Sequence, residues 1–202
     1  MTLALPPRSA KPRTRGLTSM IDFGPDTFGW TGAPDGIRNL LEVCADYIDY
    51  AKIYALNSLL MPKATVKAAA RMYRDYGVTP FAGGILFEYA WQKNDLAGLE
   101  ELLAELDIGG LEISGNYVSL TPDERARAIE RFQKRGIYIK YEFGRKNPEA
   151  PLELEELGEI VAAVGRQGVV RFGIDHKQAG QFVKFYEAGL QGYTYLEEAG
   201  AE

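Results

Sequence analysis

The segment TPDERARAIERFQKRGIYIKYEF, residues 121–143, predicts a helix that passes directly into a strand. Thr121, Pro122 and Glu124 supply an N-cap, a first-turn proline and the reciprocal carboxylate of a capping box, so we expect a helix over 122–135. Gly136 then stands where a left-handed residue ends a helix, and the alternating run 137–143 follows as a strand. This is the helix-to-strand half of a βα repeat.

The same alternation continues on both sides of this segment. Further strands are predicted at 17–22, 47–54, 78–82, 110–114, 169–175 and 193–196, and further helices at 37–45, 63–76, 96–106, 154–166 and 178–187. Seven strands that alternate with helices indicate an α/β, TIM-barrel-like fold whose barrel is seven-stranded or incomplete. We expect a single domain over 15–202, preceded by a flexible leader over 1–14.

Composition excludes several classes of protein. The 202 residues are 46% hydrophobic and 25% charged, and no apolar run is long enough for a membrane span. The net charge of −5 argues against general nucleic-acid binding. The single cysteine, Cys44, fits a reducing compartment, so we expect a cytoplasmic protein that binds no membrane and no nucleic acid.

Charged side chains recur near the carboxyl ends of the predicted strands. Because ligands of a parallel barrel bind at that end, these groups are expected to converge on one mouth. They are Asp22, Lys52, Glu112, Glu142 and Asp175, with Tyr54 and Arg171 on the same faces by alternation. Lys140, two residues before Glu142, would be buried and could act as a base or form a Schiff base. The alternative for each is a structural ion pair.

Two loops add candidates for anion binding. Gly83 and Gly84 precede Glu88 in a predicted loop, where backbone amides could approach an anion closely, although a plain tight turn is the alternative. Lys146 lies on a loop over the same mouth, or is an ordinary surface lysine. The sequence has no phosphate-binding glycine motif of the nucleotide-binding types, so no organic cofactor is expected.

Taken in order, five short motifs resemble those of the phosphosulfolactate synthase family. They are Arg15–Thr18 leading to Ile21-Asp22, then ADYIDYAK at 45–52, GGILFE at 83–88, LEIS at 111–114 and EFGRK at 142–146. The resemblance implies a TIM-type barrel and a magnesium-dependent lyase that adds sulfite to phosphoenolpyruvate. It also implies that Arg15 holds the phosphate, that Lys146 is the general acid, and that Glu112 or Glu142 holds Mg²⁺.

Other positions depart from the family pattern. IYALNS at 53–58 replaces a Gly-Trp-Gly-Thr-type run, Ser114-Gly115-Asn116 replaces Ser-Asp-Gly, and Ile85 replaces a threonine. A late arginine-bearing βα unit has no counterpart before Val169. We therefore expect a diverged lyase or C–X bond-forming enzyme that acts on a small anionic enol- or keto-acid-type substrate and makes phosphosulfolactate inefficiently.

Two alternatives remain open: a non-catalytic, stress-associated or binding relative, and a specialised-metabolism enzyme with a larger substrate, suggested by Tyr54, Leu56 and Ile85. A gap in the barrel wall would expose strand edges, so a homo-oligomer is expected.

Overall fold

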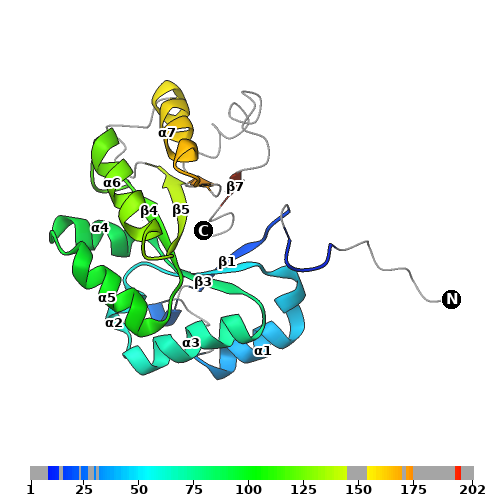
Figure 1. The fold of residues 1–202 in the computed structure, drawn as a ribbon. Coiled ribbons are helices and arrows are strands. Elements are labelled where there is room, and N and C mark those ends of the chain that lie inside the picture. The colour runs from blue at the N-terminus through cyan, green and yellow to red at the C-terminus, as the bar shows by residue number, and fades with distance from the viewer. Residues whose placement is uncertain are drawn as a thin grey trace.

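Seven parallel strands form one sheet in the computed structural model, which describes residues 9–13, 16–22, 24–26, 30, 32–144, 154–169, 172–174 and 194–196 (Figure 1). The strands are β1 (Ser19–Asp22), β2 (Tyr50–Ile53), β3 (Thr79–Ala82), β4 (Gly110–Ser114), β5 (Tyr138–Phe143), β6 (Phe172–Ile174) and β7 (Thr194–Leu196). Each strand pairs in parallel with the next along the chain, from β1 to β7. The predicted α/β class and all seven strands are confirmed.

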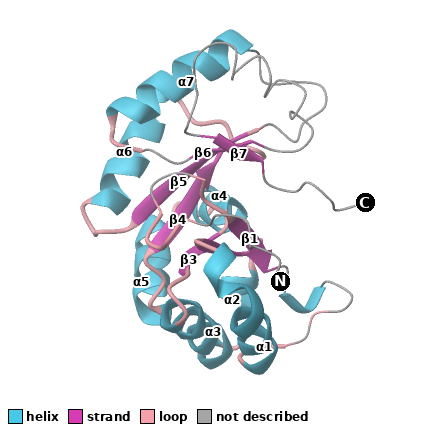
Figure 2. Ribbon diagram, turned by 90° about the vertical axis from the view of Figure 1, so that its right-hand side faces the viewer, coloured by secondary structure: helices cyan, strands magenta, loops and turns pink. Residues whose placement is uncertain are grey.

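Helices cover the outer side of this curved sheet (Figure 2). They are α1 (Asp35–Cys44), α2 (Asn57–Leu60), α3 (Lys63–Asp75), α4 (Gly84–Gln92), α5 (Leu96–Leu106), α6 (Pro122–Gln133) and α7 (Leu154–Arg166), with short 3₁₀ turns η1 (Gly24–Asp26) and η2 (Ala45–Tyr47). The helix expected at 178–187 lies outside the described residues. None of the described helices has the length and apolar character that a membrane span requires.

The capping box predicted at the start of α6 is present. The Thr121 hydroxyl accepts a hydrogen bond from the Glu124 amide at 3.3 Å, and the Glu124 carboxylate accepts one from the Thr121 amide at 2.9 Å. Gly136 follows the helix with φ = 73°, a conformation that favours glycine. These local signals place the start of β5 and the alternation of its side chains.

Apolar residues fill the space between the strands and the helices. Ala82, Leu111, Ile113 and Ile139 belong to the main core cluster, together with buried residues of α3 to α7. Successive strand residues point to opposite faces, so the strand residues that alternate with these core residues face the barrel interior. The rings of Tyr50 on β2 and Tyr138 on β5 stack there, with centroids 5.5 Å apart. These strands are not neighbours in the sheet, so the contact shows that the sheet curves around a filled interior.

Two residues of the segment expected to be a leader contact the domain. Arg13 Nε donates to Asp49 Oδ1 at 3.0 Å, and both side chains are largely buried. Lys11 Nζ donates to the Gly77 carbonyl at 3.1 Å. The N-terminal segment is therefore attached to the domain at these points.

Candidate active site

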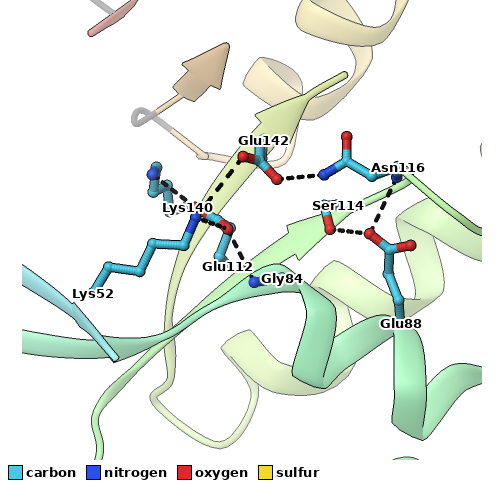
Figure 3. Close-up of polar contacts among 8 residues, drawn as sticks. All are labelled: Lys52, Gly84, Glu88, Glu112, Ser114, Asn116, Lys140 and Glu142. Atoms are coloured by element: carbon cyan, nitrogen blue, oxygen red, sulfur yellow. Dashed lines mark hydrogen bonds and ion pairs between the residues drawn. The ribbon is translucent and has the colours of Figure 1, made fainter. Parts of the chain in front are cut away.

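Three charged side chains form a buried ion cluster inside the barrel (Figure 3). Glu112, on β4, lies between two ammonium groups: Lys52 Nζ is 2.8 Å from its Oε1, and Lys140 Nζ is 2.7 Å from its Oε2. Glu112 and Lys140 are strand neighbours in register, whereas Lys52 reaches across from β2. The cluster joins β2, β4 and β5 in the barrel interior, toward the carboxyl ends of the strands.

Glu142 extends this cluster toward the mouth of the barrel. Its Oε1 lies 3.8 Å from Lys52 Nζ, and its Oε2 accepts a hydrogen bond from Asn116 Nδ2 at 2.6 Å. Glu142 is two residues beyond Lys140 on β5, so alternation places it on the same inward face. Two lysines and two glutamates thus balance in formal charge.

Glu88 fixes the turn that follows β4. Its carboxylate accepts hydrogen bonds from the Ser114 hydroxyl, from the Asn116 amide at 3.1 Å and from the Tyr117 amide at 2.7 Å. Glu88 was expected to bind substrate, but in this structure its carboxylate holds the turn 114–117. Glu88 lies on α4, which directs its side chain inward to the turn. The hydrogen bond from the Asn116 amide to this carboxylate then positions Asn116.

The glycine pair before α4 lies at the start of a helix, not in the loop that was predicted. Gly84 begins a helix instead of lying in an anion-binding loop, and its amide donates to Glu112 Oε1 at 2.9 Å. The Gly83 amide donates to the Ile53 carbonyl at 3.1 Å. The absence of side chains at these glycines lets their backbone lie close to Ser114 and Lys52. A Cβ at Gly84 would lie 2.8 Å from the Ser114 Cβ, and one at Gly83 would lie 3.1 Å from the Lys52 Cε.

Burial and charge together shift the pKa values of the central pair. Burial acts to raise the pKa of Glu112, but the ammonium groups of Lys140 and Lys52 outweigh it and hold this pKa at about 2. Burial lowers the pKa of Lys140 to about 8; Glu112 opposes this change and Lys52 adds to it. Lys140 Nζ also lies 5.0 Å above the Phe81 ring. The result is an ionised carboxylate beside a lysine that can release a proton near neutral pH.

The arrangement does not fit the magnesium site that the family resemblance implied. Three donors already surround the Glu112 carboxylate, and an Mg²⁺ ion there would bring more positive charge between two ammonium groups. The Glu142 carboxylate is likewise engaged, by Lys52 at 3.8 Å and by Asn116 Nδ2 at 2.6 Å. We therefore place no metal at Glu112 and Glu142.

Asp22 does not join the cluster, contrary to expectation. Its carboxylate accepts hydrogen bonds from Tyr73 Oη at 2.9 Å, from Trp30 Nε1 at 3.2 Å and from the Gly24 amide at 3.1 Å. Asp22 is in register with Ile53, whose side chain faces the helices, so alternation turns Asp22 toward α3. Burial and the Asp22 charge raise the pKa of Tyr73.

Of the five remaining predicted site residues, the structure describes only Tyr54. Tyr54 is half-buried just after β2, and its amide donates to the Asp22 carbonyl at 3.1 Å. Arg15, Lys146, Arg171 and Asp175 lie outside the described residues.

Asn116 is the site residue that the sequence analysis missed. It lies two residues beyond the end of β4, where a polar side chain can meet groups from the neighbouring strand. That position was noted only as a departure from a motif. A search for amide side chains just after strands could have found it.

A pocket adjoins Glu142 on the outer side of β5. It is lined in part by Gly115, Arg125, Tyr141, Glu142, Gly144 and Glu156. Arg125 Nε donates to Tyr141 Oη at 3.0 Å, so this guanidinium is held at the pocket wall. The pocket therefore lies between the carboxyl end of β5, the turn after β4 and the helices α6 and α7.

Fold and site together define an α/β protein of the TIM-barrel type with a buried polar site inside its strands. Solved structures with the same fold include N-acetylneuraminate lyase from Mycoplasma synoviae (TM-score 0.55, 15% identity, 91% of this chain and 62% of that chain). Phosphoenolpyruvate phosphomutase from Streptomyces platensis is also similar (TM-score 0.53, 11% identity, 79% of this chain and 63% of that chain).

Sequence comparison defines the family more narrowly. Residues 6–192 match the (2R)-phospho-3-sulfolactate synthase (ComA) family, and the chain belongs to it. It is 32% identical over 184 residues to phosphosulfolactate synthase of Methanothermobacter thermautotrophicus, covering 90% of this chain and 69% of the relative. The Bacillus subtilis phosphosulfolactate synthase is 28% identical over 149 residues, covering 73% of this chain and 55% of the relative. The family resemblance expected from the five motifs is confirmed.

Proposed function

We propose that the protein catalyses a lyase-type addition to a small anionic enol- or keto-acid-type substrate, bound beside Glu142. The observation that carries this proposal is the buried cluster of Lys52, Glu112 and Lys140. Burial of several charges costs more than an apolar core would, so such a cluster is better explained by chemistry than by stability. Family membership supports the reaction class.

Sulfite addition to phosphoenolpyruvate is the reference reaction for this family. The sulfur lone pair would form a C–S bond at C3, the C2=C3 π electrons would move to C2 and into the carboxylate, and a proton would then be added at C2. No group leaves. The site must therefore balance negative charge and supply one proton.

Two lysines are candidates for the proton donor. Lys140 has a pKa lowered to about 8, so it is largely protonated at neutral pH yet can give up its proton. Lys146 is the acid that the family resemblance implies. Lys52, between Glu112 and Glu142, would offset charge that develops on the substrate carboxylate.

We propose a diverged substrate because the departures lie at the mouth. The segment 53–58 and the turn 114–116 both follow strands whose residues belong to the cluster. Each charge-assisted hydrogen bond lost from a binding site is worth roughly 1.5–3 kcal/mol, so a few altered contacts would change the preferred substrate.

A direct assay tests this function. Purified protein is incubated with phosphoenolpyruvate and sulfite, with and without Mg²⁺, beside the Methanothermobacter thermautotrophicus enzyme, and product is followed by mass spectrometry. We expect much less phosphosulfolactate than the relative makes, but a raised melting temperature with one or more small carboxylates. Turnover equal to that of the relative would show that this protein catalyses the family reaction efficiently. If no carboxylate raises the melting temperature, the proposal is overturned.

The two alternatives have less support. A purely binding relative would have no need for a lysine of lowered pKa inside the barrel. A larger apolar substrate was suggested by Leu56, but this side chain packs against the main core cluster. Its apolar character therefore has a structural explanation.

We also propose that the protein forms a homo-oligomer. Val43 on α1 is 82% exposed, and Leu40 and Tyr47 beside it in sequence are also exposed. Exposed apolar residues grouped in this way are typical of subunit contacts. Light scattering of wild type and Val43→Lys tests this: a wild-type monomer would contradict the proposal, and dissociation by the substitution would support it.

A further inference from the structure

The Asn116 side chain offers an acceptor that the protein itself does not use. The residue is only 4% exposed, and its Oδ1 has no hydrogen-bond partner among the described residues. The other end of the same amide is engaged, because Nδ2 donates to Glu142 Oε2 at 2.6 Å. A buried acceptor without a donor is unfavourable, so its persistence requires an explanation.

The orientation of this amide is set by its neighbour. Exchange of Oδ1 and Nδ2 would bring a carbonyl oxygen against the Glu142 carboxylate, which would be repulsive. Oδ1 must therefore point away from Glu142, as Figure 3 shows. Rotation of the amide cannot satisfy both ends within this cluster.

The backbone that carries Asn116 is also held in place. Glu88 accepts hydrogen bonds from the Asn116 amide at 3.1 Å and from the Tyr117 amide at 2.7 Å. The Ser114 hydroxyl donates to the same carboxylate. A side chain positioned from three sides, with an unmatched acceptor beside a functional carboxylate, has the character of a preorganised binding group.

We propose that Asn116 Oδ1 accepts a hydrogen bond from a hydroxyl group of the substrate, so that the site selects hydroxy- or enol-carboxylates over analogues that lack the hydroxyl. This inference rests on the proposed function and adds the substrate class. The carboxylate of such a ligand would be balanced by the lysines of the cluster. The hydroxyl would satisfy the acceptor that the fold leaves unmatched.

Two ligands that differ by one molecule of water test the inference. 2-Phosphoglycerate and phosphoenolpyruvate share a carboxylate and a phosphate on C2, but only 2-phosphoglycerate carries a hydroxyl on C3. Calorimetry with wild-type protein is expected to show that 2-phosphoglycerate binds roughly 3- to 10-fold more tightly, the value of one neutral hydrogen bond. In Asn116→Ala the ratio of the two dissociation constants should fall to about one. The control Gln92→Ala, at an exposed position, should keep the wild-type ratio.

The possible outcomes separate the two proposals. If wild type binds both ligands equally, the substrate-class inference is overturned, because the acceptor is then satisfied by water, but the proposed function stands. If neither ligand binds, the substrate-class inference is overturned, whereas the proposed function is overturned only if no small carboxylate raises the melting temperature. If Asn116→Ala weakens both ligands equally and keeps the preference, Asn116 acts only by orienting Glu142, and the inference is again wrong. Should Asn116→Ala fail to fold, the wild-type preference remains decisive and Asn116→Ser takes its place.

Discussion

Lys140 Nζ lies 2.7 Å from Glu112 Oε2, and both side chains are completely buried. The two residues are opposite each other on β4 and β5, so the sheet register alone holds them in contact. Lys52 then adds a second ammonium group to the same carboxylate. The carboxylate is therefore the centre of the cluster, and the lysines depend on it more than it depends on either of them.

This asymmetry predicts unequal costs of substitution. Glu112→Gln should lower the free energy of unfolding by about 3–5 kcal/mol, because it leaves two buried ammonium groups without their shared partner. Lys140→Met should cost less, since Glu112 keeps Lys52 and the Gly84 amide. Urea denaturation measures both, and the double variant should be less destabilised than the sum. A larger cost for Lys140→Met would contradict the shared-partner arrangement.

Acid should weaken the fold through Glu112. Its folded-state pKa of about 2 is below the ordinary value of 4.5, so the ionised form stabilises the native state above pH 4.5. That stability should be lost as the pH falls from 4.5 toward 2, by roughly 3 kcal/mol in total. Urea unfolding across this range should show a flatter pH dependence for Glu112→Gln than for wild type. Equal slopes would mean that Glu112 does not carry the effect.

The close approach at Gly84 predicts sensitivity to a single methyl group. Gly84→Ala would place a Cβ 2.8 Å from Ser114 Cβ and 3.2 Å from Glu112 Oε1, so α4 must move and the ion cluster with it. We expect a loss of about 1–3 kcal/mol in stability and of ligand response. Gly109→Ala is the matched control, because a Cβ there meets no atom within 4 Å. Similar behaviour of the two variants would show that the clash is relieved cheaply.

Glu142→Gln should separate binding from folding. The glutamine oxygen can still accept from Asn116 Nδ2, so the melting temperature without ligand should change little. Removal of the negative charge beside Lys52 should nevertheless lessen the repulsion of an anionic ligand and so enlarge the rise in melting temperature that small carboxylates produce. Glu130→Gln, on the exposed surface of α6, serves as a charge-matched control. A wild-type ligand response in Glu142→Gln would show that the site has been placed wrongly.

Local sequence patterns were sufficient to predict the boundaries of several helices and strands. The strand β4 and the helices α5 and α7 begin and end at the predicted residues, and α6 begins at its predicted residue. Alternation correctly placed Lys140 and Glu142 on one face of β5. Local reasoning failed for α4, because GILFEYAWQ is apolar on most sides and starts with a glycine, which is also typical of a turn.

Sequence alone was enough to establish a parallel βα protein with charged residues inside its strands, since period-two alternation and helix-ending glycines are properties of neighbouring residues. It could not establish which charges meet. Lys52 and Glu112 are separated by the whole of β3 in the sheet, and only the curvature of the barrel brings them to 2.8 Å. In the same way, the direction of Asp22 and the contact between Asn116 and Glu142 depend on register and on the turn that Glu88 holds. These are long-range relationships, and no local pattern encodes them.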